Sequence, residues 1–106
     1  MAILGAEKQE EKIVEMGKTG REMFPEISLM NFKGAFRMGV KSALEKSGYQ
    51  EWKELVDKTK TEKKKFFDLI LDGSRHHLEN LGLHGSDIDK LNETLKKKNE
   101  AFVNRA

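Results

Sequence analysis

The chain has 106 residues, of which 36% are charged and none is cysteine, and its formal net charge is +2 at pH 7. The lack of cysteine excludes disulfides, thiolate zinc sites and thiol catalysis, and the near balance of charges is unlike the clustered basic excess of most nucleic-acid-binding domains. One proline and plentiful Lys, Glu, Leu, Met and Ala favour helices over sheet. No window of membrane-spanning length is free of charge, and Glu7 and Lys8 end the apolar start too early for a secretory signal. We therefore expect one soluble, cytoplasmic, all-α domain over residues 1–106.

The first expected helix covers about residues 2–18. Its apolar stripe is interrupted in the middle by Glu10, so we expect this helix to pack mainly through its second half. Gly17 and Gly20 are expected to end it, because glycine commonly terminates helices.

The second expected helix begins near Pro25 or at Ser28 and runs to about Lys46. Proline suits a first helical turn, and Ser47-Gly48 supplies an ending. Its apolar positions recur at helical spacing along one face: Leu29, Phe32, Phe36, Val40 and Leu44.

A third helix is expected over residues 49–72 as one continuous element of some six turns. Its apolar stripe stays in phase across the polar stretch from Lys58 to Lys65, and a break would usually lose that phase. The alternative is two helices hinged at residues 59–61. Asp72-Gly73 is the expected end.

A short helix over residues 74–81, capped by Ser74 and stopped by Gly82, is expected next. The last helix is expected to start at Ser86, with Asp89 three residues on in a near capping box.

Taken together, these helices predict a small antiparallel, up-and-down bundle of four main helices plus one short helix. The expected core comprises Phe32, Phe36, Val40, Trp52, Leu55, Phe66, Phe67, Ile70, Leu78, Leu91, Leu95 and Phe102.

Gly17-Lys18-Thr19 resembles the end of a phosphate-binding P-loop. That motif requires a glycine five residues before Gly17, where a backbone amide approaches phosphate, and Lys12 stands there instead. No strand is expected before it either. A helix end is the preferred interpretation.

The histidines do not form a metal motif in the sequence. His76 and His77 are adjacent and point about 100° apart on a helix, so they do not readily share one ion. His76 could meet Glu79, but the carboxylate-first Glu-x-x-His motif of di-iron bundles is absent. No nucleophile stands in a recognisable catalytic setting, so we expect no enzyme activity, no metal and no cofactor.

The expected helix over residues 28–46 has an unusual surface. Lys33, Arg37 and Lys41 are spaced four apart and form a basic ridge that contains Met30. Ile27 and Met38 are expected nearly opposite the apolar face. Two glycines in this helix each cost about 1 kcal/mol against alanine, and close packing is the ordinary compensation. One interpretation is a central helix flanked on two sides, with the ridge in water. The other is a binding face, because methionine suits adaptable contacts and a basic apolar helix suits acidic partners or membrane surfaces.

A second basic feature is the lysine cluster of Lys60, Lys63, Lys64 and Lys65. Such a cluster is attracted to any phosphate backbone, although a solvated lysine run is the commoner meaning of this pattern.

The sequence therefore favours a non-enzymatic helical protein-binding module of the adaptor, inhibitor or regulator type, of the kind that phages and plasmids carry. Its expected partner is another protein of unknown identity, contacted through Met30, Lys33, Arg37, Met38 and Lys41. A homodimer is one form of this hypothesis. The alternative is nonspecific nucleic-acid binding through the basic ridge together with the lysine cluster.

Overall fold

A computed structural model describes residues 3–105 of the chain, with side chains over residues 7–100. It contains four α-helices, α1 (Ile3–Met23), α2 (Leu29–Ser47), α3 (Lys60–Asn80) and α4 (Gly85–Arg105), and a 3-10 helix, η1 (Trp52–Leu55). The described residues form no strand. The expected all-α antiparallel bundle is confirmed.

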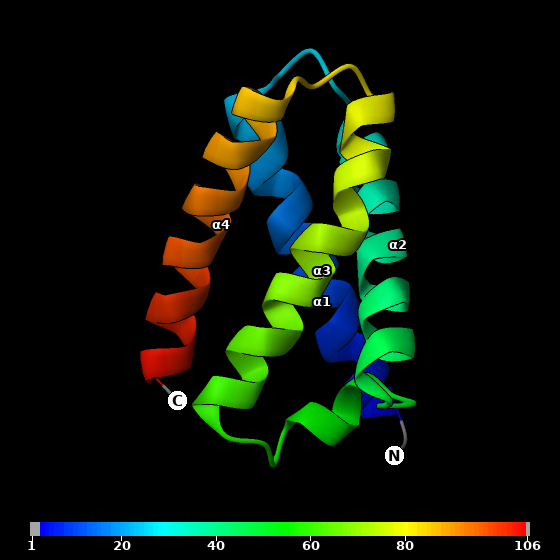
Figure 1. Cartoon of the computed structure of the whole chain (residues 1–106), viewed down its shortest axis with the longest axis vertical. Coiled ribbons are helices and arrows are strands. Elements are labelled where there is room, and N and C mark those ends of the chain that lie inside the picture. The colour runs from blue at the N-terminus through cyan, green and yellow to red at the C-terminus, as the bar shows by residue number, and fades with distance from the viewer. Residues whose placement is uncertain (1–2, 106) are drawn as a thin grey trace.

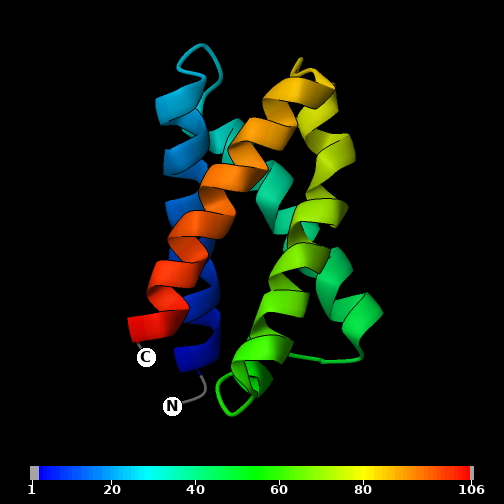
Figure 2. The ribbon, with the colours of Figure 1, turned by 60° about the vertical axis from the view of Figure 1, so that its left-hand side comes forward.

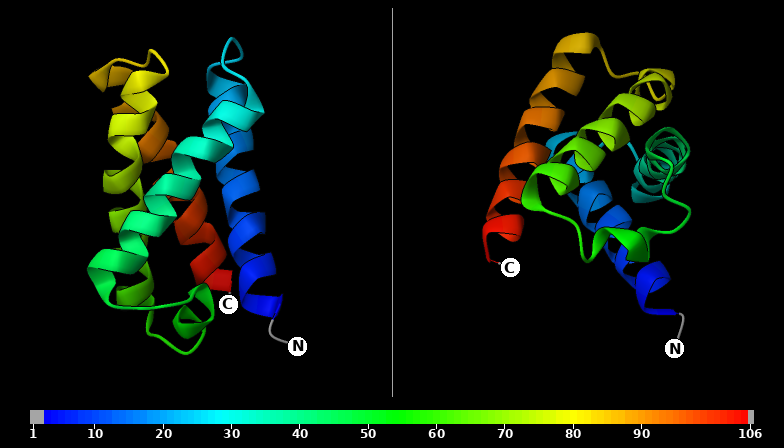
Figure 3. Two further views of the ribbon diagram at one scale, coloured as in Figure 1. Left: turned by 90° about the vertical axis from the view of Figure 1, so that its right-hand side faces the viewer. Right: turned by 60° about the horizontal axis from the view of Figure 1, so that its bottom comes forward.

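The helices run alternately up and down, so that both described ends of the chain lie at the same end of the bundle (Figure 1). The connections α1–α2 and α3–α4 lie at the opposite end. α2 and α3 make the most extensive helix pair, and α4 packs across α1 and α3 (Figure 2). η1 returns to the end of the bundle where α1 begins, and it packs against α1 (right-hand view of Figure 3).

One hydrophobic core joins residues from all four helices. Most of the expected core residues are buried, while Trp52 is only half-buried and packs against the edge of the core. The side chain of Phe102 lies outside the described residues. Fully buried residues that extend the expected set include Ile13, Met16, Leu71 and Ile88.

The prediction that α1 ends near Lys18 is wrong, because the helix continues to Met23. Gly17 and Gly20 lie inside α1, where it packs against α2. A Cβ on Gly20 would lie 2.7 Å from the ring of Phe32, and one on Gly17 would lie 3.1 Å from Leu29. These glycines therefore permit close helix packing instead of ending the helix.

Of the two predicted starts of α2, the one at Ser28 is observed and Pro25 lies in the turn before the helix, while the predicted end at Ser47-Gly48 is confirmed. The Ser28 hydroxyl accepts a hydrogen bond from the Asn31 amide at 3.1 Å, which satisfies one free amide of the first turn. Gly48 follows the helix with φ of 84°, a left-handed conformation that glycine adopts readily.

The prediction of one continuous helix over residues 49–72 is wrong. The chain breaks, as in the hinged alternative, but the break lies at residues 56–59 instead of 59–61, and the segment before it is only the short 3-10 helix η1. After η1 the chain turns, and Thr59 caps a new helix by accepting a hydrogen bond from the Glu62 amide at 3.2 Å. Trp52 and Phe66, both members of the predicted apolar stripe, still meet across the break, with ring centroids 5.6 Å apart. Helical phase alone therefore did not reveal the change in chain direction.

The predicted ending at Asp72-Gly73 and the separate helix over residues 74–81 are also wrong, because α3 runs unbroken to Asn80. Gly73 lies where α3 crosses α2: a Cβ there would be 2.8 Å from Ser42 Cβ, and Gly39 Cα lies 3.3 Å from the same position. Ser74 is fully buried and donates a hydrogen bond to the Leu71 carbonyl instead of capping a helix. Gly82, with φ of 101°, does follow the helix end as expected.

α4 begins one residue before the expected Ser86. The Asp87 carboxylate accepts a hydrogen bond from the His84 amide at 3.2 Å, while Asp89 pairs with Arg75 of α3 at 3.0 Å. Instead of the expected cap at Ser86, Asp87 of the first turn accepts the hydrogen bond from the His84 amide just before the helix. Ile88, Leu91 and Leu95 then face the core, as their spacing predicts.

Candidate functional site

The outer face of α2 carries two exposed methionines. Met30 is 80% exposed and Met38 is 42% exposed, which makes them two of the three large apolar side chains most open to solvent in the described part of the chain. Gly34 lies between them on the same side of the helix, one turn from each. Met30, Gly34, Arg37, Met38 and Lys41 are here called the outer face.

Gly34 and Gly39 have different surroundings although both lie in α2. A Cβ on Gly39 would collide with the Ile70 carbonyl and approach Ser74 Cβ to 2.9 Å, so this glycine lets α3 come close. A Cβ on Gly34 would meet nothing within 4 Å. The helix-propensity cost of Gly34 is therefore not offset by packing against the described residues.

The basic ridge is partly neutralised by α1. Arg37 donates two hydrogen bonds to the Glu10 carboxylate, at 2.8 and 3.1 Å, and the Lys33 amine lies 3.6 Å from it. The hydrogen bond from Arg37 is the main reason that the pKa of Glu10 lies below its usual value. Lys41 is exposed further along the ridge. The α2 surface keeps a positive excess, because no acidic residue occurs between Ile27 and Leu44.

Sequence reasoning did not anticipate the role of Glu10. The available signal was its position as an acidic residue inside the apolar stripe of the first helix. Such a residue needs a partner on the neighbouring helix or an exposed position, and here it obtains both.

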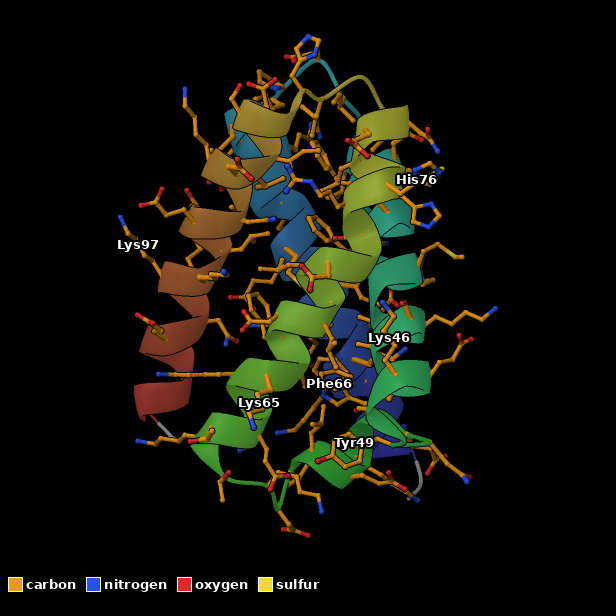
Figure 4. The ribbon with its side chains drawn as sticks, in the orientation of Figure 1. Lys46, Tyr49, Lys65, Phe66, His76 and Lys97 are labelled. Atoms are coloured by element: carbon orange, nitrogen blue, oxygen red, sulfur yellow. The ribbon has the colours of Figure 1, made fainter. Side chains whose placement is uncertain are left out.

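The lysine cluster and the basic ridge lie on opposite sides of α1. Lys33 reaches Glu10, whereas Lys63 shares a groove with Lys12, and positions two apart on a helix point about 160° from each other. Lys60, Lys64 and Lys65 are exposed on the first turns of α3, and Lys65 is labelled there in Figure 4. The structure does not join the ridge and the cluster into one surface.

A groove of about 410 Å³ lies between α1, η1 and α3, with Asn99 of α4 at one side. Its apolar lining includes Trp52, Val56, Phe66 and Phe67, and Val56 is 55% exposed. The break between η1 and α3 creates this groove, because it turns the η1 residues to face Phe66. Figure 4 shows Phe66 and Tyr49 close together at this end of the bundle, where their ring centroids are 6.1 Å apart.

Five charged residues line the same groove, and they differ in depth. Lys12 and Lys63 are half-buried, whereas Lys8, Glu11 and Glu15 are exposed. The Lys12 amine lies 5.3 Å from the centroid of the Phe67 ring, within reach of a cation–π interaction. Burial lowers the pKa of Lys12, while the nearby Glu15 carboxylate acts in the opposite direction.

The P-loop-like segment is part of an internal contact. Thr19 is buried, donates a hydrogen bond to the Glu15 carbonyl and accepts one from the Lys98 amine at 2.9 Å. It therefore ties α1 to α4 from within a helix.

His76 points outward from α3 (Figure 4), and its ring lies edge-on to that of His77 with centroids 5.9 Å apart. Within residues 7–100, no group of three or more His, Asp and Glu side chains is placed to hold a metal ion.

Comparison of the chain with known protein families, with curated proteins and with solved structures finds no match. Over the described residues, none of the helices combines the length and apolar character needed to cross a membrane.

Proposed function

We propose that the protein is a non-enzymatic binding module whose outer face of α2 receives an acidic amphipathic helix of another protein. The observation that carries the proposal is the row Met30–Gly34–Met38. Two exposed methionines flank a glycine whose missing side chain leaves room for a second backbone. Methionine side chains adapt to varied apolar partners, and helix-in-groove recognition uses anchors at this spacing.

The charge around this row selects the kind of partner. Arg37 and Lys41 border it, and among residues 7–100 Glu10 is the one acidic residue paired with the ridge. A second copy of the chain would bring the same basic side chains to the interface, which is repulsive. An acidic helix from another protein avoids that repulsion, and for this reason we favour it over a homodimer.

The test compares capture by two charge-matched double variants of the full chain. Met30→Glu with Met38→Glu adds two acidic groups to the outer face. Thr61→Glu with Asn80→Glu adds two to exposed positions of α3. Both variants and the unmodified protein are used as bait in extracts of the source organism, and retained proteins are identified by mass spectrometry.

The expected result is a protein retained by the unmodified chain and by the α3 variant, and lost from the outer-face variant. Rebinding of that purified protein, measured by calorimetry, should weaken by tenfold or more when Met30 and Met38 are replaced together, as for central interface residues. Identical retained sets for the two variants would overturn the proposal. Light scattering on the isolated chain should give the monomer mass. A dimer that is lost only in the outer-face variant would show that the outer face binds a second copy of the chain instead of another protein.

Nonspecific nucleic-acid binding has less support, because the ridge and the lysine cluster do not share a surface. A gel-shift titration at low salt is the direct check, since phosphate contacts are strongest there.

A further inference from the structure

The groove between α1, η1 and α3 has the dimensions of a small-molecule site. Its volume of about 410 Å³ lies within the range of about 300–1,000 Å³ that is usual for ligand pockets. Such pockets are mainly apolar with a few placed polar groups. Here aromatic residues Trp52, Phe66 and Phe67 provide the apolar part, and the side chains of Lys12 and Lys63 are among the polar groups of the lining.

The apolar part of the groove is partly open. Val56 is 55% exposed and Trp52 is half-buried, although both lie beside the buried rings of Phe66 and Phe67. A ligand chain lying there would remove Val56 and Trp52 from water without displacing the core. Burial of apolar surface is the main source of affinity for such a chain.

The charged residues that line the groove determine which ligand head group it favours. Lys12 and Lys63 are half-buried beside the aromatic lining, whereas the two acidic residues, Glu11 and Glu15, are exposed to water. Charges near low-dielectric walls act more strongly than charges in water. Three lysines and two glutamates line the groove, so the lining carries one excess positive charge, which favours an anion.

We propose that this groove binds a single-chain anionic amphiphile, a medium-chain carboxylate, with its hydrocarbon chain on Trp52 and Phe66 and its carboxylate at Lys12 and Lys63. The site is separate from the outer face of α2 and does not depend on the proposed partner.

Trp52 provides a local signal for the test, because it is the only tryptophan in the chain and it lines the groove. Its fluorescence is followed while octanoate, decanoate or dodecanoate is added to the full chain below the concentration at which each aggregates. Decanol and decyltrimethylammonium serve as neutral and cationic ligands of equal chain length. Saturable binding should strengthen by roughly fourfold per added methylene until the groove is filled.

Decanoate should bind at least about tenfold more tightly than decanol, which is the effect of one charge-assisted hydrogen bond. Decyltrimethylammonium should bind most weakly of the three. Equal affinity for the three head groups, or no saturable change in Trp52 fluorescence with any of them, would overturn the proposal.

Variants locate the binding in the groove. Lys12→Gln and Lys63→Gln should each weaken decanoate binding by about tenfold and leave decanol binding unchanged, while Lys46→Gln, at an exposed position of α2, should have no effect. Val56→Glu places an acidic group at an already exposed position, so it should abolish decanoate binding without altering the far-ultraviolet circular dichroism. Wild-type affinity in Val56→Glu, or equal weakening by Lys46→Gln, would show that the amphiphile binds elsewhere.

Discussion

Gly34 and Gly39 lie five residues apart in the same helix and have opposite surroundings. Gly39 allows the α3 backbone to approach, whereas the space beside Gly34 is open. A glycine costs the helix about 1 kcal/mol against alanine at either position. For Gly39 that cost is offset by contact with α3, whereas the described part of the chain provides no such contact for Gly34.

Alanine substitution should therefore act in opposite directions at these two residues. Gly34→Ala should raise the free energy of unfolding by about 1 kcal/mol, because it improves helix propensity and creates no clash. Gly39→Ala should lower it by about 1–3 kcal/mol, because the added methyl forces α2 and α3 apart. Urea unfolding of both variants beside the parent protein measures the difference. A destabilising Gly34→Ala would mean that the free chain already packs against this position.

At the scale of the element, the segment between α2 and α3 decides where the lysine cluster lies. A continuous helix over residues 49–72 would place Lys60, Lys63, Lys64 and Lys65 in its middle. The observed break places them in the first two turns of α3, where the helix dipole is positive and cations are unfavourable. The Thr59 cap and the acidic Glu62 in the first turn compensate for part of that repulsion.

Loss of the Thr59 cap should consequently weaken α3. Thr59→Ala removes the oxygen that accepts the Glu62 amide and should lower the free energy of unfolding by about 1 kcal/mol. Thr61→Ala is the matched control, since Thr61 is exposed in the same turn and does not cap the helix. Chemical denaturation of the two variants should separate them. Equal stabilities would show that the break at residues 56–59 does not depend on this hydrogen bond.

At the scale of the molecule, all four helices contribute to one core. Leu91 of α4 and Phe32 of α2 are both fully buried in the same cluster as Ile13 of α1. A shared core of this kind is expected to unfold cooperatively, without a separate transition for α4.

Leu91→Ala should lower the free energy of unfolding by about 2–5 kcal/mol, because it creates a cavity in the shared core. The loss should be the same when followed by circular dichroism and by Trp52 fluorescence, although Trp52 lies in η1 and not in α4. Lys90→Ala, at an exposed neighbouring position, should change stability by less than about 0.5 kcal/mol. Two separated transitions in Leu91→Ala would indicate that α4 unfolds independently.

The sequence by itself determined the features that depend on local chemistry. Helical spacing identified the buried faces of α2 and α4, and the roles of Ser28, Gly48 and Gly82 followed from capping rules. The exposure of Met30 and Met38 agrees with their position on the polar side of that spacing.

Only the tertiary structure decided the features that depend on residues distant in sequence. Glycine can end a helix or admit a neighbouring helix, and Gly20 and Gly73 take the second role only because Phe32 and Ser42 lie against them. The stripe over residues 49–72 fits a straight helix as well as two segments whose aromatic rings meet across a turn. The pairing of Glu10 with Arg37 spans 27 residues, so no local pattern specifies it. The outer face of α2 was therefore visible in the sequence, whereas the groove beside Trp52 exists only because the chain folds back at residues 56–59.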